Sequence, residues 1–360
     1  MGAGGAQAFI MNYYRNVDRN KVQFDFAVRS YDKKFFDDEI EELGGKLYRV
    51  PWFNVKNYFS YKRFWENFFK EHPEIDIVHG HLGSSAQVYL SVAKKYGKIA
   101  IAHSHSVAPK KKDLYNYIYK IFSYPTRYIA DYLFACGKNV GIDRYGKKKK
   151  VFIVPNAIDV ESFLYNEENR KKIRNELKIN DNFVIGHVGR FYYPKNHEFM
   201  IDIFKEINIK NPNSKLLLVG SGELMEKIKE KVKSLNLEKD VIFVGAKNNV
   251  NEYLSAMDLF LFPSIFEGLP VALIEAEASG IKCISSTNVP KESDVTGLVD
   301  FIDLNDKQKW IDAVLNIEKD YKRISTIDMI TKAGYNIKEK SNWLTDFYIK
   351  ANNERTNLKK

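Results

Sequence analysis

The sequence predicts an α/β protein built of two doubly wound, parallel sheets that face a central cleft. Three observations support this prediction. Short apolar runs alternate with stretches of helical spacing, the alternation repeats after the midpoint, and 360 residues are many for one core. Ligands of such sheets bind beyond the carboxyl ends of the strands, so chemistry is expected there.

Each half of the sequence contains five apolar runs of strand length. They are residues 24–28, 75–79, 99–102, 132–135 and 151–154 in the first half, and 184–188, 215–219, 241–244, 259–262 and 282–284 in the second. Segments of helical spacing lie between them, for example 84–96 and 197–210. The seam is expected at 154–163, which gives a first domain over 1–157, a second over 158–340 and a last helical segment over 341–360.

The start of the chain departs from this pattern. A Gly-rich turn at residues 2–5 leads directly into a predicted helix over 6–14. Such a turn normally follows a strand, and none precedes it here. We therefore expect the first strand of the first domain to be missing from this sequence, within about 10–20 further residues. The alternative is that the turn is a flexible start.

The net charge of +10 belongs to the first half of the chain. Residues 1–155 hold 26 Lys and Arg against 15 Asp and Glu, whereas the remaining 205 hold 30 against 31. This asymmetry indicates an anionic partner, such as a membrane surface or a phosphorylated substrate, with ordinary solvation by lysine as the alternative. No aromatic–basic recognition module is present, so no nucleic acid partner is expected. The sequence has no apolar run long enough to span a bilayer, and Cys136 and Cys283 lack metal-site spacing.

The stretch "GHVGRFYYPKNH", residues 186–197, places two cations after a predicted strand. Arg190 follows the strand directly, and Lys195 lies in the loop that opens the next helix. A guanidinium gives bidentate phosphate contacts and an ammonium gives a mobile point charge, so together they can neutralise a diphosphate without a metal. The alternative is an ordinary pair of surface cations.

The stretch "SIFEGLPVALIEAEASG", residues 264–280, has carboxylates at both ends of an apolar segment. Pro270 suits the first turn of a helix, so Glu267 lies in a loop and Glu275 on a helix predicted over 271–279. Because the segment between the two glutamates is part loop and part helix, it can bring both carboxylates to the same rim of the predicted cleft. The alternative is that these glutamates only cap or solvate the helix.

Two further pairs of candidate residues lie at the ends of predicted strands. Gly220 and Gly222 follow the strand at 215–219, where small residues let the backbone approach a ligand, although every such turn favours glycine. His103 and His105 end the strand of "IAIAHSHS" and share a face if the extended path continues. We expect these two histidines to form hydrogen bonds with a polar group of a bound ligand. The alternative is that backbone groups satisfy their hydrogen-bonding atoms. A metal would need a third ligand, none is evident nearby, and no metal site is expected.

In this order the motifs resemble the retaining glycosyltransferases of the GT-B-fold family 4 (group 1). "GGAQAFIMNYYRNVDRNKVQFDF" and "HSHS" are especially similar to bacterial capsule and exopolysaccharide members, and the resemblance covers essentially the whole chain. It implies two Rossmann-like domains facing a cleft, the first on the acceptor side and the second holding a nucleotide-sugar donor. It also implies that the last segment crosses back to the first domain.

The resemblance implies roles for the second-domain residues. Glu267 would contact hydroxyls of the donor sugar, and Glu275 would accept hydrogen bonds from the ribose hydroxyls, as suits acceptor-only carboxylates. The N–H groups of Gly268 and Leu269 would face the diphosphate, and the turn at Gly220 and Gly222 would let the backbone approach the donor. Arg190 and Lys195 are similar to the family's basic pair, which stabilises the departing diphosphate.

In the first domain, the resemblance matches Gly4 and Gly5 to the turn that approaches the phosphate or sugar. His105 is similar to the family's donor-sugar histidine, and His103 is the second candidate for that role. The basic stretches "VAPKKKD" and "YGKKKKV" would meet anionic lipid or a lipid-linked diphosphate sugar.

The function implied is a metal-independent, retaining hexosyltransferase of bacterial capsular or exopolysaccharide synthesis. It would take a nucleotide-sugar donor, with UDP favoured over GDP and no further cofactor, and a lipid-linked saccharide acceptor. We expect a cytoplasmic protein in peripheral contact with the inner face of the membrane. Two alternatives stay open: a catalytically silent nucleotide-sugar-binding partner of a polysaccharide-assembly complex, and a sugar-nucleotide epimerase, which would need additional first-domain carboxylates.

Overall fold

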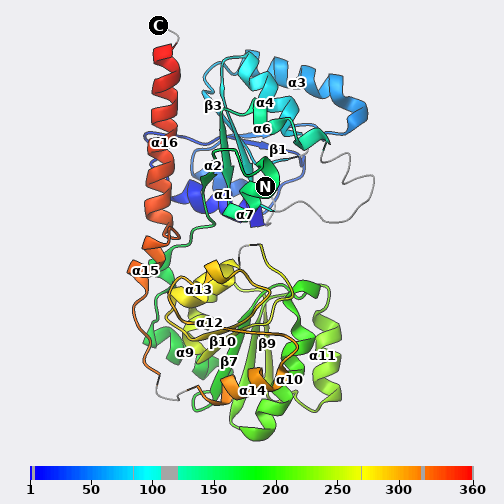
Figure 1. Cartoon of the computed structure of the whole chain (residues 1–360), viewed down its shortest axis with the longest axis vertical. Coiled ribbons are helices and arrows are strands. Elements are labelled where there is room, and N and C mark those ends of the chain that lie inside the picture. Colours follow the sequence, from blue (N-terminus) through cyan, green and yellow to red (C-terminus); the bar gives the residue numbers. More distant parts are fainter. Residues whose placement is uncertain (2–4, 84, 107–120, 269, 318–320, 359–360) are drawn as a thin grey trace. The chain divides into compact units, whose positions relative to one another are not determined.

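The structure, a computed structural model, describes residues 1, 5–83, 85–106, 121–268, 270–317 and 321–358. The chain divides into two compact units (Figure 1). Unit 1 comprises Met1–Ala157 together with Ile337–Lys360, and unit 2 comprises Ile158–Asn336. Both units are parallel α/β structures, so the predicted fold class is confirmed.

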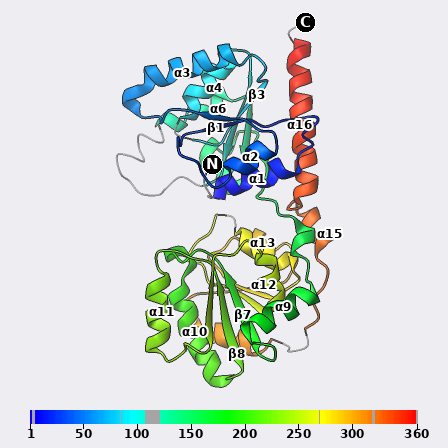
Figure 2. The same cartoon turned by 180° about the vertical axis from the view of Figure 1, so that it is seen from behind.

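Unit 2 contains a six-stranded parallel sheet with helices on both faces (Figures 1 and 2). Its strand order is β12-β11-β10-β7-β8-β9. The strands are β7 (Phe183–Val188), β8 (Ser214–Val219), β9 (Val241–Gly245), β10 (Leu259–Phe262), β11 (Cys283–Ser286) and β12 (Val299–Ile302). The helices are α8 (Val160–Phe163), α9 (Glu167–Leu177), η2 (Tyr193–Lys195), α10 (His197–Lys210), α11 (Met225–Ser234), α12 (Val250–Ala256), α13 (Val271–Ala278), η3 (Lys291–Ser293), α14 (Lys307–Leu315) and α15 (Ile327–Lys332).

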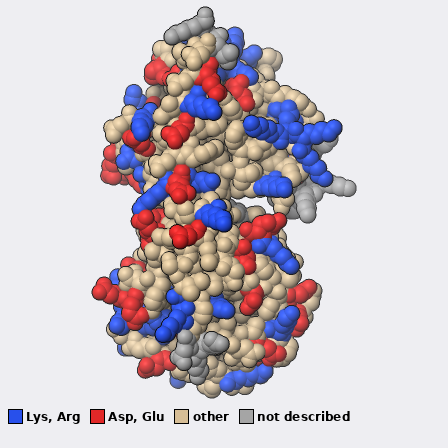
Figure 3. Space-filling model, turned by 60° about the vertical axis from the view of Figure 1, so that its left-hand side comes forward, with Lys and Arg blue, Asp and Glu red and all other residues tan. Residues whose placement is uncertain are grey.

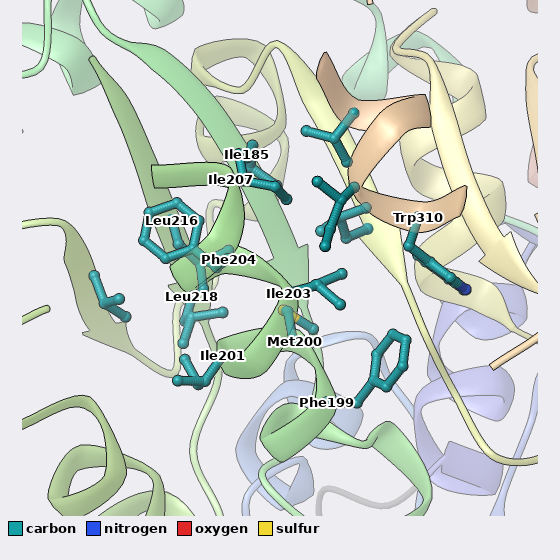
Figure 4. Packing of buried hydrophobic residues seen from close by; sticks show 14 of the residues in the cluster. Ile185, Phe199, Met200, Ile201, Ile203, Phe204, Ile207, Leu216, Leu218 and Trp310 are labelled. Carbon is teal, nitrogen blue, oxygen red and sulfur yellow. The ribbon is translucent and has the colours of Figure 1, made fainter. Parts of the chain in front are cut away.

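The core of unit 2 follows from the two-residue period of its strands. Along β8, Leu216 and Leu218 join a cluster with α10, α11 and α14, whereas Leu217 and Val219 join one with α9, α12 and α13. Figure 4 shows Phe204 and other side chains of α10 against Leu216 and Leu218. Because both faces are covered, interior strands such as β8 and β10 are continuous apolar runs, which is why the sequence revealed them.

Unit 1 contains a four-stranded parallel sheet, β3-β4-β5-β6, and a separate two-stranded parallel sheet, β1-β2. The strands are β1 (Phe26–Val28), β2 (Leu47–Arg49), β3 (Ile77–Gly80), β4 (Ile99–Ser104), β5 (Tyr132–Ala135) and β6 (Phe152–Ile153). The helices are α1 (Gly5–Asn16), α2 (Asp37–Glu42), η1 (Val55–Asn57), α3 (Tyr58–Glu71), α4 (Ala86–Lys95), α6 (Thr126–Ile129), α7 (Lys138–Tyr145) and α16 (Ile337–Leu358).

Helix α16 packs against unit 1 beside α1 (Figures 1 and 2). Phe9 and Tyr13 of α1 lie in one buried cluster with Leu344 and Tyr348 of α16 and with Ile101 of β4. On the other side of the sheet, α3 and α4 form a second cluster. None of the helices in the described ranges combines the length and apolar character needed to cross a membrane.

The predicted strands all appear, with ends shifted by a few residues, and two short strands were missed. β2 and β12 lie at the outer edges of their sheets, where partly exposed residues interrupt the apolar run. The expectation of one sheet in the first half is wrong. β1 and β2 pair only with each other among the strands of the described ranges, so the apolar runs of this half form two sheets.

Candidate active site

The candidate site of unit 2 lies where the carboxyl ends of β7, β8 and β10 meet. These strands are neighbours in the sheet, so the loops that follow them are neighbours as well. Backbone hydrogen bonds join the loops: Phe191 N–H donates to Ser221 O at 3.0 Å, and Ile265 N–H donates to Pro194 O at 2.8 Å. Lys195 and Glu267, 72 positions apart in sequence, are thereby held together.

Gly220 and Gly222 permit this close approach of loop to loop. A Cβ on Gly220 would lie 2.0 Å from Gly189 O, and one on Gly222 would lie 2.4 Å from Phe191 O. Gly220 also has a φ of +144°, a conformation that side chains disfavour. The two glycines therefore have a structural role in this loop contact, separate from the ligand contact predicted for them.

Lys195 and Glu267 form an ion pair at this edge. Lys195 Nζ lies 2.8 Å from Glu267 Oε1, and their side chains are only 12% and 10% exposed. Lys195 Nζ also lies 4.4 Å from the ring centroid of Phe262, the last residue of β10. The structure thus brings together two of the predicted catalytic residues, and Glu267 orients the ammonium group.

Glu275 lies on α13 within the electrostatic reach of this pair. Loss of surrounding water raises the pKa of Glu275 to about 7, and the nearby Lys195 charge opposes that rise. A carboxyl group with this pKa changes its ionisation near neutral pH, so Glu275 is not a fully solvated helix residue.

The other predicted residues of unit 2 lie at the surface of the same edge or outside the described ranges. Arg190 pairs with Glu223 at 3.0 Å, and the Arg190 side chain is 68% exposed. Gly268 is exposed, and a Cβ placed on it would meet no atom within 4 Å. Leu269 lies outside the described residues.

Two buried histidines behind Lys195 were not identified from the sequence. His187 of β7 has Nδ1 2.8 Å from Leu261 O, and His197, which begins α10, stacks on Phe191 at 4.0 Å between ring centroids. Burial lowers the pKa of His197 to about 4, assisted by the Lys195 charge, so its ring is neutral. In the sequence they are marked only by position: His187 lies within the predicted strand 184–188, and His197 follows Lys195 by two residues.

In unit 1, four histidines gather at the carboxyl ends of β3 and β4. His79 and His81 join His103 and His105 there, and we call this set the histidine cluster. His79 Nε2 lies 3.1 Å from His103 Nδ1, and His81 Nδ1 lies 2.8 Å from His105 Nε2. The expectation that no third ligand lies near His103 and His105 is wrong, because β3 and β4 pair in parallel and end together.

The histidine cluster is neutral. Burial lowers the pKa of His79 to about 3 and that of His105 to about 4, and it places the pKa values of His81 and His103 well below the usual value. The neighbouring imidazoles add to the lowering for His79, His81 and His103, since a charge on one ring disfavours a charge on the next.

Of the two predicted glycines of the first domain, only Gly5 can be placed. It is the first residue of α1, it is exposed, and a Cβ on it would meet nothing within 4 Å. Gly4 and the basic stretch 107–113 lie outside the described residues. Helix α1 nevertheless reaches the histidine cluster, because the ring centroid of Phe9 lies 4.9 Å from that of His103 and 4.8 Å from that of His105.

Comparison with known proteins places this geometry in a family. Residues 169–336 match the family described as Glycosyl transferases group 1, and residues 3–162 match Glycosyltransferase Family 4. The Bacillus subtilis (strain 168) protein EpsF, named as a glycosyltransferase, is 33% identical over 85% of this chain and 82% of its own length.

Two further proteins support the assignment. An Escherichia coli protein named UDP-Gal:alpha-D-GlcNAc-diphosphoundecaprenol alpha-1,3-galactosyltransferase is 30% identical over 76% of this chain and 75% of its own. The crystal structure of Anabaena Alr3699/HepE in complex with UDP superposes with a TM-score of 0.71 at 15% identity, covering 99% of this chain and 96% of that one, which shows a shared fold. The chain therefore belongs to the group 1, family 4 glycosyltransferases and has their GT-B fold.

Proposed function

We propose that this chain transfers a hexose from a UDP-sugar to a lipid-linked saccharide in bacterial capsule or exopolysaccharide synthesis, with retention at the anomeric carbon. The observation that carries the proposal is the buried Lys195–Glu267 pair with Glu275 beside it, at the carboxyl edge of unit 2. The UDP and diphosphoundecaprenol in the name of the Escherichia coli relative support this choice of donor and acceptor.

Each of these groups suits one part of a nucleotide sugar. The Lys195 ammonium, held by Glu267, supplies positive charge for a diphosphate. Arg190 is exposed, and a diphosphate can replace Glu223 as its partner.

In the first turn of α13, the N–H groups of Leu273 and Ile274 donate to Pro270 O. Those of Val271 and Ala272 precede every carbonyl of the helix with which they could pair, and they can face the diphosphate. Glu275, once ionised, accepts hydrogen bonds from the vicinal hydroxyls of a ribose.

In the proposed reaction, the bond between the anomeric carbon and the diphosphate breaks while the acceptor hydroxyl attacks from the same face. The hydroxyl proton passes to the departing diphosphate oxygen. Negative charge grows on the diphosphate as the bond breaks, so fixed cations aimed at it lower the barrier. A contact of His105 with the donor sugar stays a prediction of the resemblance.

Donor binding tests the first half of the proposal. UDP, GDP and their hexose conjugates are added to wild type, Glu275→Ala and the control Glu226→Ala, whose side chain is 79% exposed on α11. We expect UDP compounds to raise the melting temperature of wild type and of the control but not of Glu275→Ala. Absence of any shift with every nucleotide, in a wild-type protein that melts cooperatively, would refute the proposed donor site.

Transfer to a lipid-linked acceptor tests the second half. UDP-hexoses are incubated with N-acetylglucosaminyl-diphospholipid, and the anomeric configuration of the product is read by NMR. We expect an α-linked product from the α-linked donor. UDP binding without turnover on any lipid-linked acceptor would instead support a silent nucleotide-sugar-binding partner.

We also propose peripheral contact of unit 1 with an anionic membrane surface. In Figure 3 a group of Lys and Arg side chains lies at the right-hand edge of unit 1, whereas both signs of charge are mixed over the rest of the visible surface. Lys147, Lys148 and Lys150, which follow α7, are exposed. Clusters of this size attract anionic lipids by about 1 kcal/mol per lysine.

Vesicle sedimentation at low salt tests this contact. Wild type should sediment with anionic vesicles, and replacement of Lys147, Lys148 and Lys150 by alanine should reduce the fraction of protein retained with them. The matched control is alanine at three lysines of α11 in unit 2: Lys227, Lys229 and Lys233. Equal retention of the two triple variants, or no retention of wild type, would contradict the proposal.

A further inference from the structure

The histidine cluster of unit 1 contains more imidazole than a sugar contact needs. Ligand nitrogens of His79, His81 and His103 all lie within 4.8 Å of one another, and no other group of this kind occurs among the residues that the structure describes. His105 adds a fourth ring through its contact with His81 at 2.8 Å. Three neutral imidazoles with nitrogens this close together are a set of nitrogen ligands for a metal ion.

Two ring nitrogens of the histidine cluster lack a hydrogen-bond partner. His103 is 4% exposed, and its Nε2 is buried without a partner in the described part of the chain. The same holds for Nδ1 of His105. A buried polar atom without a partner is costly. These two nitrogens lie on the opposite side of each ring from the nitrogens that face the neighbouring imidazoles, His103 Nδ1 and His105 Nε2, so they are not the proposed ligand atoms.

We propose that the histidine cluster binds one late first-row transition metal ion, of the Zn²⁺ or Co²⁺ type, through His79, His81 and His103. Imidazole nitrogen suits these borderline ions, whereas Mg²⁺ and Ca²⁺ prefer oxygen. Three histidines with an open fourth position are an established arrangement for zinc. The proposal concerns metal binding alone and assigns the ion no step in sugar transfer.

The spacing of the nitrogens fits such an ion. Tetrahedral coordination with Zn–N bonds of about 2.0–2.1 Å separates ligand nitrogens by about 3.3 Å. His79 Nε2 and His103 Nδ1 are already 3.1 Å apart. Binding therefore replaces the hydrogen bond between these two rings by a shared ion, and the nitrogen of His81, within 4.8 Å of the other two, has to move closer to them.

Tyr348 of α16 orients the first of these ligands. Its hydroxyl is hydrogen-bonded to His79 Nδ1. When His79 Nδ1–H donates to the Tyr348 oxygen, the lone pair of Nε2 faces the cluster, which is the tautomer that a metal requires. Tyr348 is therefore a positioning residue for the proposed site.

Metal binding is measured on tag-free, chelator-treated protein by calorimetry with Zn²⁺ and by visible absorption with Co²⁺. We expect one ion per chain, no heat with Mg²⁺, and loss of binding in the double variant His79→Gln/His81→Gln. Tyr348→Phe should weaken binding by about 10- to 100-fold, because it removes the partner that fixes the tautomer of His79.

The matched control is His72→Gln, which removes the partly exposed histidine paired with Glu74. It should bind as wild type does. Absence of Zn²⁺ binding by wild type, or binding that survives in the double variant and is lost in His72→Gln, would overturn the proposal.

X-ray absorption at the zinc edge of wild type keeps the test decisive if the double variant fails to fold. Nitrogen neighbours at about 2.0–2.1 Å with imidazole scattering are expected, and a shell of oxygen alone would also overturn the proposal.

Discussion

Lys195 Nζ lies 2.8 Å from Glu267 Oε1, although 72 positions separate the two residues. The reason is the strand order: β7 and β10 are neighbours in the sheet, so the loops after them meet. Because both side chains are about nine-tenths buried, removing one partner leaves the other charge with little water to solvate it.

The first prediction concerns this pair. Lys195→Met should lower the free energy of unfolding by about 3 kcal/mol, because a buried carboxylate is left unpaired. Glu267→Gln in the same background should recover part of that loss. Urea unfolding of both single variants and the double variant measures the coupling energy. Strictly additive losses would show that the pair contributes nothing.

The second prediction concerns the pH dependence of donor binding. The pKa of Glu275 is about 7, so its carboxyl is mostly protonated at pH 6 and mostly ionised at pH 8. Affinity for UDP-glucose should rise about tenfold over that interval, since only the ionised form accepts from both ribose hydroxyls. Calorimetry on wild type and Glu275→Gln measures this change, because the diphosphate diester does not titrate there. A variant profile as steep as that of wild type would contradict the assignment.

The third prediction concerns stability and pH through Glu277. Burial raises its pKa to about 8, against hydrogen bonds from Thr296 and from the Val295 N–H. The folded state holds this proton more tightly than the unfolded state, so protonation of Glu277 contributes to the free energy of unfolding. This contribution is complete below about pH 4.5 and is lost as the pH rises through about 8. Glu277→Gln cannot ionise.

The unfolding free energy of Glu277→Gln relative to wild type should therefore increase from pH 5 to pH 9, by at most about 1.4 kcal/mol per pH unit. Denaturant titrations at four pH values measure this difference. The exposed Glu226→Gln is the control and should show a constant difference. A pH-independent difference for Glu277→Gln would exclude the buried, protonated carboxyl.

The fourth prediction compares two glycines of the candidate site. Gly220→Ala should lower the unfolding free energy by about 1–3 kcal/mol, because its Cβ would meet Gly189 O at 2.0 Å and its φ is +144°. Gly268→Ala should change it by less than about 0.5 kcal/mol, since open space surrounds that position. Thermal and urea unfolding measure both, and equal losses would refute the structural role of Gly220.

The buried sheet of unit 2 was predictable because interior strands such as β8 and β10 are apolar runs. Lys195 and Glu267 were predictable as separate candidates, from their places after strands together with the family motifs, but their ion pair depends on β7 lying beside β10. The histidine cluster was not predictable, because it depends on the pairing of β3 with β4, and a sequence does not display which strands are neighbours. His79 and His81 also stand in "VHGHLG", where they look like any strand end.

Helix α16 gives the chain an order of assembly. Unit 2 is one continuous segment, entered at Ile158 and left at Asn336, and these ends pair with each other in a parallel bridge. Unit 1 is discontinuous, because the cluster around Ile101 and Phe134 is completed by Leu344 and Tyr348 of α16. During synthesis on the ribosome, unit 2 can thus fold before α16 emerges, whereas unit 1 cannot complete its core until α16 has emerged.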